Sequence, residues 1–437
     1  MHLNPALPQT IHTIPLAPLA AIVYAALLIG TALITMRRPI GGVCILILVQ
    51  PFAVYADIFG TTITLSKVAL VGALLGCIAF PGAFAKLRER APAKLLLAGV
   101  LVIAAMLLSI LQAAHHMPVL REVLKGIEYL ALFCVVYAAY RLEPNRRPIR
   151  IAVVAVTIAV ALASLAQEIL GAPSVLLVHG HATPRIAGPL EGPNQLAGYL
   201  EISLPLIFAF CIEQSEMFVH LALCLALFAD VLTFSRGGGI GAIAGIATVG
   251  VVYRRRDLRD AFIYAGLGVL LGAIVAAFWG VVAHSIGLFR FWSFARVENA
   301  GGVGTRPQLW RAAFELWQRH PLLGVGAGNF ELDLPLVGLN GIRTHANSLY
   351  LQALVEGGIP QLAATLYLVY VSIATFLREA AGSPLIAAAL GASIALALHQ
   401  IFDYLIFYPK IGGWWWILLA LGVAELVRLK RTQAPCE

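Results

Sequence analysis

The sequence predicts an all-α membrane protein, a polytopic bundle of about 12 to 13 transmembrane helices. Of the 437 residues, 60% are hydrophobic and 12% are charged, and the mean hydropathy is +0.88. No ordinary soluble domain needs so many apolar residues to fill its core. The apolar runs are long and lack the alternation expected of a transmembrane β-barrel. Helices are therefore the expected spanning elements, because a helix satisfies its own backbone polar groups.

Basic clusters separate the apolar runs and predict the topology. They lie at 37–38, 86–90, 141–150, 254–259, 378 and 428–431, and the positive-inside rule places them in the cytoplasm. Pro51, Pro81 and the charged segment 121–128 interrupt the early runs, so twelve spans with both ends inside fit as well as thirteen. The predicted spans lie near 17–36, 40–57, 65–84, 94–113, 118–140, 150–170, 192–212, 217–235, 238–253, 261–282, 358–377, 384–405 and 412–428.

We expect residues 1–437 to form a single integral membrane domain, with its first apolar run kept as an anchor, because no Lys or Arg precedes that run. Counting back from the 254–259 cluster places 171–191, the turn at Arg236 and a large loop at 283–345 outside the cytoplasm. This loop is basic, with Arg290, Arg296, Arg306, Arg311, Arg319 and Arg343. Long loops cross membranes regardless of charge. Binding of an anionic substrate is the second interpretation.

The segment 305–320 of the loop predicts a short interfacial helix. Thr305 is a candidate N-cap, Pro307 suits the first turn, and Pro321 ends the helix. Its aromatic residues recur at helical spacing, which fits a helix in the headgroup layer with Arg311 and Arg319 toward water. The glycines of 324–328 are expected to form turns, because no strand pattern precedes them as a dinucleotide-binding loop requires.

A polar stretch lies at 343–358, at the mouth of a hydrophobic helix, and contains His345, Asn347, Gln352 and Glu356. A helix from about Ala346 would place 345, 349, 352 and 356 on one face, and the break at 357–360 would end it. His345 is either a hydrogen-bonded residue at a helix start or a base, since its ordinary pKa of about 6.5 suits proton transfer. Glu356 would either orient His345 or cap the break.

Three further polar residues lie where loops meet spans. Arg236 occupies a glycine-rich turn between two apolar runs, where a guanidinium could bind phosphate oxygens or act as an interfacial anchor. Arg185 and Asn194 flank a Gly/Pro-rich loop. They could serve the function of the protein, or Asn194 could cap the helix that follows and Arg185 could lie in the headgroups. The pair His399 and Asp403, the pair Lys125 and Glu128, and the lone Asp230 are interpreted as structural.

The remaining charge and the cysteines predict neither nucleic acid binding nor a metal site. Much of the net charge of +8 lies beside apolar spans, so topology explains it more simply than nucleic acid does. The six cysteines form no CxxC motif and no Cys/His cluster. We expect no metal, no other cofactor and no disulfide framework.

Three landmarks together resemble the O-antigen ligase and polymerase superfamily of bacterial envelopes. They are Thr-Phe-Ser-Arg236-Gly, the segment from Arg306-Pro-Gln-Leu-Trp to Gly-Val-Gly-Ala-Gly-Asn-Phe330, and His345-Ala-Asn-Ser-Leu-Tyr-Leu-Gln-Ala-Leu-Val-Glu-Gly. The resemblance covers about Arg185 to Asp403. It implies a membrane-embedded, metal-independent glycosyltransferase of the polyprenyl-linked type, in the inner membrane with its active site facing the periplasm.

The resemblance also implies the substrates and the residue roles. The donor would be an undecaprenyl-diphosphate-linked glycan, and a ligase would pass the glycan to a sugar hydroxyl of the lipid A core. Arg236 and Arg306 match the arginines expected to hold the diphosphate, and His345 matches the histidine that activates the acceptor. Arg185, Asn194, Asn347 and Arg311 are the candidate substrate-binding residues. Ala346 stands between His345 and Asn347, whereas the family histidine is often followed directly by Asn.

The chemistry of the residues themselves agrees with that mechanism and leaves alternatives open. Two outer arginines could neutralise a diphosphate leaving group, and one base would suffice for an inverting displacement. A polymerase or a protein O-oligosaccharyltransferase would use the same donor site. A transporter is the alternative from another class, motivated by intramembrane charges such as Glu128 and Asp230.

Overall fold

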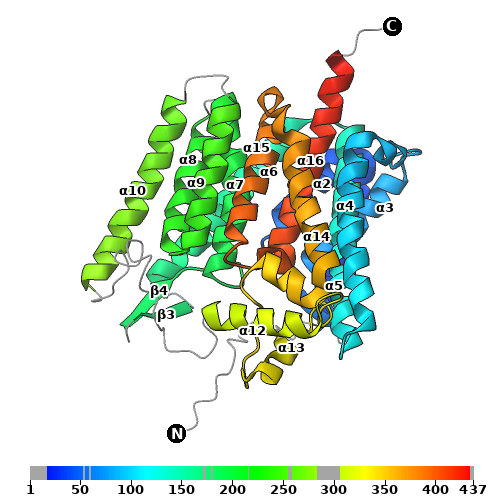
Figure 1. Ribbon diagram of the computed structural model, residues 1–437. Coiled ribbons are helices and arrows are strands. Elements are labelled where there is room, and N and C mark those ends of the chain that lie inside the picture. The colour runs from blue at the N-terminus through cyan, green and yellow to red at the C-terminus, as the bar shows by residue number, and fades with distance from the viewer. Residues whose placement is uncertain are drawn as a thin grey trace.

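The computed structural model describes residues 17–52, 55–58, 61–170, 174–178, 181–214, 216–253, 258–282 and 306–433. These residues form a helical bundle with shorter elements at one end (Figure 1). Within the described part of the chain, six helices are long and apolar enough to cross a membrane, and six further apolar helices are shorter. The prediction of an all-α polytopic bundle is confirmed.

The helices are α1 (Ala17–Arg37), α2 (Pro39–Val49), α3 (Leu65–Ile78), α4 (Arg90–Leu108), α5 (His116–Leu142), α6 (Arg146–Leu170), α7 (Pro193–Glu213), α8 (Met217–Leu232), α9 (Arg236–Val252), α10 (Arg259–Val282), α12 (Arg306–Arg319), α13 (Phe330–Asp333), α14 (Leu349–Leu377), α15 (Pro384–His399) and α16 (Pro409–Gln433). The strands are β1 (Tyr55–Ile58), β2 (Thr61–Thr64), β3 (Ser174–Val178) and β4 (His181–Arg185).

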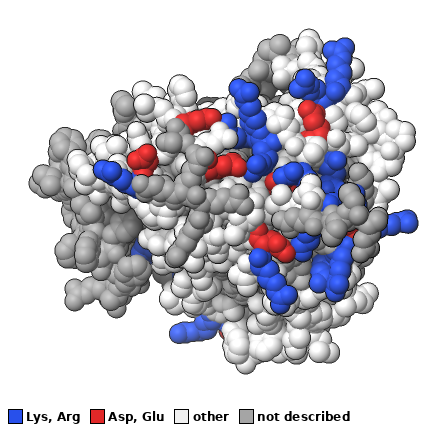
Figure 2. Space-filling view, turned by 90° about the horizontal axis from the view of Figure 1, so that it is seen from above, with Lys and Arg blue, Asp and Glu red and all other residues white. Residues whose placement is uncertain are grey.

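The basic clusters meet at one end of the bundle, which we call the basic end. Ion pairs join them there: Arg38 with Glu143, Arg141 and Arg431 with Glu89, Arg146 with Glu213 and Glu425, Arg150 with Glu216, and Lys430 with Glu379. Figure 2 views the bundle from above in Figure 1, with blue Lys and Arg side chains gathered mainly on the right half of the face. Segments widely separated in the sequence therefore end on one side, as the positive-inside rule requires of a common compartment.

The centre of the bundle is built from α7 and α16. In each of these helices, 94% of the most apolar 18-residue window is buried inside the protein. The Trp414 Nε1 group donates a hydrogen bond of 2.9 Å to Ser203 Oγ, so the indole nitrogen is satisfied within the core. Helix α15 packs against α7, α9 and α16. The residues that follow α15 and precede α16 are thus held by the most enclosed part of the fold.

Two β-hairpins differ from the predicted elements. Strand β1 follows α2, which ends at Val49, so the predicted span at 40–57 is shorter than expected. Strand β3 pairs with β4 in antiparallel register, with Ser174 opposite Arg185, in a segment predicted only as a loop. The apolar run of β3 is too short for its hydrophobic periodicity to identify a strand, because a short apolar run fits a buried helix segment as well. The β3–β4 hairpin delivers Arg185 to the end of the bundle opposite the basic end.

Helix α14 begins later than predicted and contains a kink. Its N-cap is Ser348 and its first residue is Leu349, so His345 precedes the helix and does not share its face. Gly358 has φ 63° and ψ −157°, a conformation open essentially to glycine alone. Pro360 follows and lacks the N–H that would continue the hydrogen-bond ladder. The predicted break at 357–360 is therefore present inside one longer helix.

We expect Gly358→Ala to lower the free energy of unfolding by about 2 kcal/mol or more. A methyl group at this position would overlap the carbonyl group of Leu322 as well as require the unfavourable φ. Thermal unfolding of the purified protein measures the change. Gly30→Ala is the matched control, because Gly30 lies in α1 with no atom within 4 Å of its added Cβ. Equal melting temperatures for the two variants would contradict the strained-kink assignment.

Candidate active site

Helix α12 forms the first part of the site and confirms the predicted short helix. Leu309, Ala312, Ala313 and Leu316 are buried against the start of α14 and the segments between these helices. Phe314 is exposed, and the Trp310 ring stacks on Phe402. The inner face is thus aliphatic, with the aromatic residues beside it. Placement of this helix in lipid headgroups stays a prediction. Thr305, Arg290 and Arg296 lie outside the described residues.

His345 is enclosed by the segment between α15 and α16. Its ring centroid lies 5.7 Å from that of Tyr404, 5.8 Å from Phe407 and 6.1 Å from Tyr408. The nitrogen Nε2 is 3.3 Å from Tyr408 Oη. The first N–H of α14, on Leu349, donates to carbonyl groups of this same segment at 2.9 and 3.0 Å. The histidine and its aromatic surround are therefore tied together through backbone hydrogen bonds.

The surroundings of His345 favour a neutral imidazole. Burial lowers the pKa of His345 below its ordinary 6.5, while Asp403 raises it and Arg306 and Lys125 lower it. Its Nδ1 accepts the backbone N–H of Asn347 at 3.3 Å. A neutral ring with Nδ1 as acceptor carries its proton on Nε2, which then donates to Tyr408 Oη. To take up a proton at Nε2, the neutral ring must carry its hydrogen on Nδ1. The hydrogen bond from the Asn347 N–H to Nδ1 is long, so it opposes this tautomer only weakly.

A chain of polar contacts connects β4, α7 and the segment after α15. Arg185 Nε donates to the Thr233 carbonyl oxygen at 2.6 Å, and Arg185 Nη2 donates to Asn194 Oδ1 at 2.8 Å. Asn194 Nδ2 in turn donates to Asp403 Oδ2 at 2.8 Å. Thr233 lies three residues before Arg236, so Arg185 fixes the turn that carries Arg236. The structure thus brings Arg185 and Asn194 together in a positioning network, and their predicted role in substrate binding stays a prediction.

Arg306 and Arg236 lie near the end of this network. Arg306 Nη2 is 3.9 Å from Asp403 Oδ2, and the charge of Arg306 acts on Arg236. Arg306 Nε is buried and forms no hydrogen bond with any described residue. Arg236 is the first residue of α9, whose N-cap Ser235 accepts the Gly238 N–H at 3.3 Å. The charges of two guanidinium groups from separate elements therefore act on each other, and one carboxylate lies beside Arg306, an arrangement suited to an anion.

The glycine-rich segment before α13 is joined to the first turns of α14. Gly324, Gly326 and Gly328 have positive φ angles of 67°, 100° and 72°, which confirms their prediction as turn residues. The backbone N–H groups of Val325 and Gly326 donate to carbonyl groups of α14 at 2.9 and 2.8 Å. A side chain at Gly324 would overlap the backbone of α14. This close approach places α13 and its Glu331 beside His345.

Glu356 acts on the backbone beside His345 and does not contact the imidazole. Its Oε1 accepts Gln352 Nε2 at 2.8 Å and the Phe330 N–H at 3.4 Å. Gln352 Oε1 accepts the Ala346 N–H at 2.6 Å. Glu356 is thus linked through Gln352 to the residue that follows His345. Glu356 was predicted either to orient His345 or to cap the break at 357–360. The structure connects it to His345 only indirectly, through Gln352 and the backbone of Ala346.

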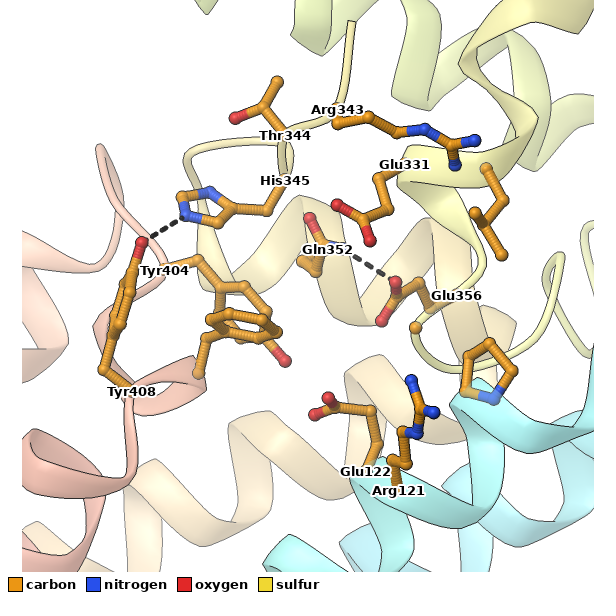
Figure 3. Close-up of a pocket in the computed structure, with 14 residues that line it drawn as sticks. Arg121, Glu122, Glu331, Arg343, Thr344, His345, Gln352, Glu356, Tyr404 and Tyr408 are labelled. Atoms are coloured by element: carbon orange, nitrogen blue, oxygen red, sulfur yellow. Dashed lines mark hydrogen bonds between the residues drawn. The ribbon is translucent and has the colours of Figure 1, made fainter. Parts of the chain in front are cut away.

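A cavity of about 470 Å³ opens beside His345 (Figure 3). Its charged lining residues are Arg121 and Glu122 of α5, Glu331 of α13, Arg343, and Glu356 of α14. Tyr404 and Tyr408 form the wall next to His345. Neither Arg236 nor Arg306 lines this cavity. His345 therefore lines a cavity with mixed charges and also feels the charge of Arg306, which lies outside that cavity.

A family model described as O-Antigen ligase matches residues 221–366. This region is similar to the O-antigen ligase family. Family members are glycosyltransferase-like enzymes, and the apolar helices fit a multi-pass membrane protein. The O-antigen ligase region includes Arg236, Arg306 and His345, whereas Arg185, Asn194 and Asp403 lie outside it. No curated protein matches the chain closely enough to count as a relative.

Two predicted residues of the O-antigen ligase region remain apart from its polar network. Arg311 is exposed on α12, and the structure gives it no ion pair with another described residue. Asn347 takes φ 50° and contributes its backbone N–H to His345. Among the described residues, no three His, Cys, Asp or Glu side chains are grouped to hold a metal ion. Roles of Arg311 and the Asn347 amide in substrate binding stay predictions.

Asp403 and Tyr408 are the site residues that sequence reasoning missed. The spacing of His399 and Asp403 predicted a helical pair, but α15 ends at His399. His399 Nδ1 lies 2.8 Å from Glu201 Oε2, so the predicted pair is wrong, and Asp403 instead contacts Asn194 and Arg306. Lys125 similarly bonds to Glu122 at 2.7 Å and not to Glu128. These partners come from distant parts of the chain, which spacing within one segment does not reveal.

Proposed function

We propose that this protein is an O-antigen ligase that transfers a glycan from undecaprenyl diphosphate to a sugar hydroxyl of the lipid A core. The proposal places it in the bacterial inner membrane with the site facing the periplasm. The observation that carries it is the convergence of Arg236, Arg306 and His345 at the end of the bundle opposite the basic end. These residues come from the region that matches the O-antigen ligase family.

The two arginines would hold the diphosphate of the donor. A guanidinium presents a planar set of N–H donors that matches phosphate oxygens and remains charged when partly desolvated. Arg306 Nε has no hydrogen bond within the described protein and would gain one from a phosphate oxygen. The positive charges would also stabilise the negative charge that develops on the leaving diphosphate. Asp403 and Asn194 would position Arg306 and keep its charge partly balanced before the donor binds.

His345 would accept the proton of the attacking hydroxyl. The acceptor oxygen forms a bond to the anomeric carbon of the donor sugar while the bond from that carbon to the phosphate oxygen breaks. The diphosphate leaves with the electron pair, and the acceptor proton moves to His345 Nε2 in the tautomer that carries hydrogen on Nδ1. Attack opposite the leaving group inverts the anomeric centre. The low pKa of His345 keeps the imidazole neutral and ready to accept this proton.

The pH dependence of kcat/KM tests the base. Because the pKa of His345 lies below 6.5, kcat/KM is expected to rise with pH as the imidazole loses its proton and to level off by about pH 7. Asp403 favours the charged imidazolium, so Asp403→Asn should shift the acidic limb to lower pH. A limb that stays in place or moves upward in this variant would contradict the coupling between Asp403 and His345.

Deletion of the gene separates a ligase from the related activities. Loss of a ligase leaves bare lipid A core while lipid-linked polymer accumulates. Loss of a polymerase would instead leave core that carries a single repeat, and loss of a protein O-oligosaccharyltransferase would leave the lipopolysaccharide unchanged. Gel analysis of lipopolysaccharide and extraction of the lipid-linked glycans measure these outcomes. Core bearing one repeat would reject the ligase assignment in favour of a polymerase.

A further inference from the structure

We propose that Glu201 and His399, which we call the buried pair, are positioning residues for donor binding and set the place of the helix turn that begins with Arg236. This inference rests on the proposed function, in which Arg236 holds the donor diphosphate. Both side chains are enclosed in the bundle, with 0% and 2% of their surface exposed. Burying ionisable groups among apolar helices costs free energy, and inside membrane bundles such groups generally serve a function.

The buried pair connects α7 to α15. Glu201 lies near the middle of α7, and His399 is the last residue of α15. His399 Nδ1 donates a hydrogen bond of 2.8 Å to Glu201 Oε2. Rotation of the imidazole would break this bond and bury both atoms without a partner, which is costly. The buried pair therefore forms a fixed polar bridge between two helices of the core.

The first turns of α9 lie directly on this bridge. Helix α9 packs against both α7 and α15 (Figure 1). A methyl group at Gly237 would overlap the His399 ring, 2.7 Å from Nε2, and a methyl group at Gly241 would overlap Glu201 Oε2. Glycine at these positions, about one helical turn apart, lets the α9 backbone approach the buried pair. Because Gly237 follows Arg236 directly, the imidazole sets how closely the Arg236 backbone approaches the core.

The turn before α9 has a strained backbone that its surroundings must hold. Phe234 has φ 51°, a left-handed conformation that is uncommon for residues other than glycine. On the α8 side, Thr233 Oγ1 donates to the Asp230 carbonyl oxygen at 2.6 Å, and Arg185 Nε donates to the Thr233 carbonyl oxygen at 2.6 Å. On the α9 side, the turn rests on the buried pair. Loss of the buried pair would thus release one side of the turn that carries the proposed diphosphate ligand.

The end of α15 also supports the second proposed diphosphate ligand. Asp403 lies four residues after His399, and its Oδ2 is 3.9 Å from Arg306 Nη2. The bond from His399 to Glu201 therefore fixes the helix end from which the Asp403 segment begins. The two proposed ligands depend on the same helix end, Arg236 through the glycine contact and Arg306 through Asp403.

Donor binding by the purified protein tests the contact between Gly237 and His399. Gly237→Ala should raise the dissociation constant for a fluorescent polyprenyl diphosphate on the order of tenfold, as expected when a charged hydrogen bond is weakened. Gly239→Ala is the matched control, because its added methyl group lies in the same turn with no atom within 4 Å. It should bind the donor as the wild type does. Alanine is the better helix former at both positions, so helix propensity does not explain a difference.

A double variant separates positioning from general destabilisation. His399→Ala makes room for the methyl group of Gly237→Ala, so the effect of Gly237→Ala on donor binding should fall from about tenfold to below about twofold in that background. The acceptor KM should stay close to wild type in each single variant. An equal effect of Gly237→Ala with and without the imidazole would overturn the inference.

Variants of Glu201 test the bridge independently of Gly237. Glu201→Gln keeps an oxygen that accepts from His399 and should bind the donor nearly as the wild type does. Glu201→Leu is close in volume but lacks the acceptor, so its dissociation constant should rise on the order of tenfold. Thermal unfolding identifies the folded variants, and either the Gly237 or the Glu201 series decides if the other does not fold.

The outcomes distinguish the inference from the proposed function. Wild-type donor affinity in folded Gly237→Ala or folded Glu201→Leu would overturn the inference alone, even if the melting temperature falls, because the buried pair would then only stabilise the bundle. Absence of both donor binding and transfer in the wild-type protein would reject the proposed function and the inference together.

Discussion

Replacing His345 with alanine is expected to lower kcat for glycan transfer by about 10²- to 10⁴-fold, the usual contribution of a positioned general base. Binding of donor and acceptor should change little, because the methyl side chain removes no phosphate ligand. The side chain lies in a loop before α14, so its removal leaves the hydrogen-bonded helix start intact. Transfer of labelled glycan under single-turnover conditions, with separate binding measurements, separates these effects.

His320→Ala is the matched control for that experiment. His320 lies at the same end of the bundle and bonds to Gln112 through Nδ1 at 2.7 Å, without contacting the cavity beside His345. Its replacement should leave transfer close to wild type. Wild-type transfer by His345→Ala would remove His345 from the mechanism. Tyr408→Phe gives a related measure, since it deletes the hydrogen-bond partner of Nε2 while keeping the ring.

Arg236→Ala and Arg306→Ala are expected to reduce transfer by about 10²- to 10³-fold each and to weaken donor binding. Each substitution removes a guanidinium from the proposed diphosphate site. Arg306→Lys keeps a positive charge but loses the forked geometry, so an intermediate loss is expected. Donor binding can be measured with a fluorescent polyprenyl diphosphate, and transfer with the complete donor.

The controls for the arginines follow from their partners. Arg319→Ala removes an exposed arginine of the same helix as Arg306 and should preserve both donor binding and transfer. Asn194→Ala should lower activity less than Arg306→Ala, because it frees Asp403 and Arg185 but keeps both guanidinium groups. Unchanged donor binding in both arginine-to-alanine variants would contradict the diphosphate assignment.

The spans could be predicted because apolar runs and basic clusters are properties of single segments. Each of α1 to α10 and α14 to α16 corresponds to a predicted apolar run. The β3–β4 hairpin could not be predicted with the same ease, because its pairing depends on two short segments and the bundle beneath them. The start of α14 was misplaced by three residues, although Ser348 offered an N-cap signal.

Residues of the candidate site could be predicted where the residue type was unusual for its position in the sequence. Arg236 in a glycine-rich turn and His345 beside a basic loop are examples, and the structure brings Arg236, Arg306 and His345 to one end of the bundle. Asp403 was missed because helical spacing pointed to His399, whereas its actual contacts with Asn194 and Arg306 cross the bundle. Arg121 looked like the charged start of a span, whereas in the folded chain it lines the cavity beside His345 with residues of α13 and α14.

Reconstituted transfer with purified protein tests directly whether the protein is a ligase. The protein would be mixed with a glycan on undecaprenyl diphosphate and with lipid A core, and the glycosylated core and the released lipid diphosphate would be measured. We expect equal amounts of both products, formed only when donor and acceptor are present and lost in Arg306→Ala and His345→Ala. Correctly folded wild-type protein that forms no glycosylated core from these substrates would contradict the proposed function.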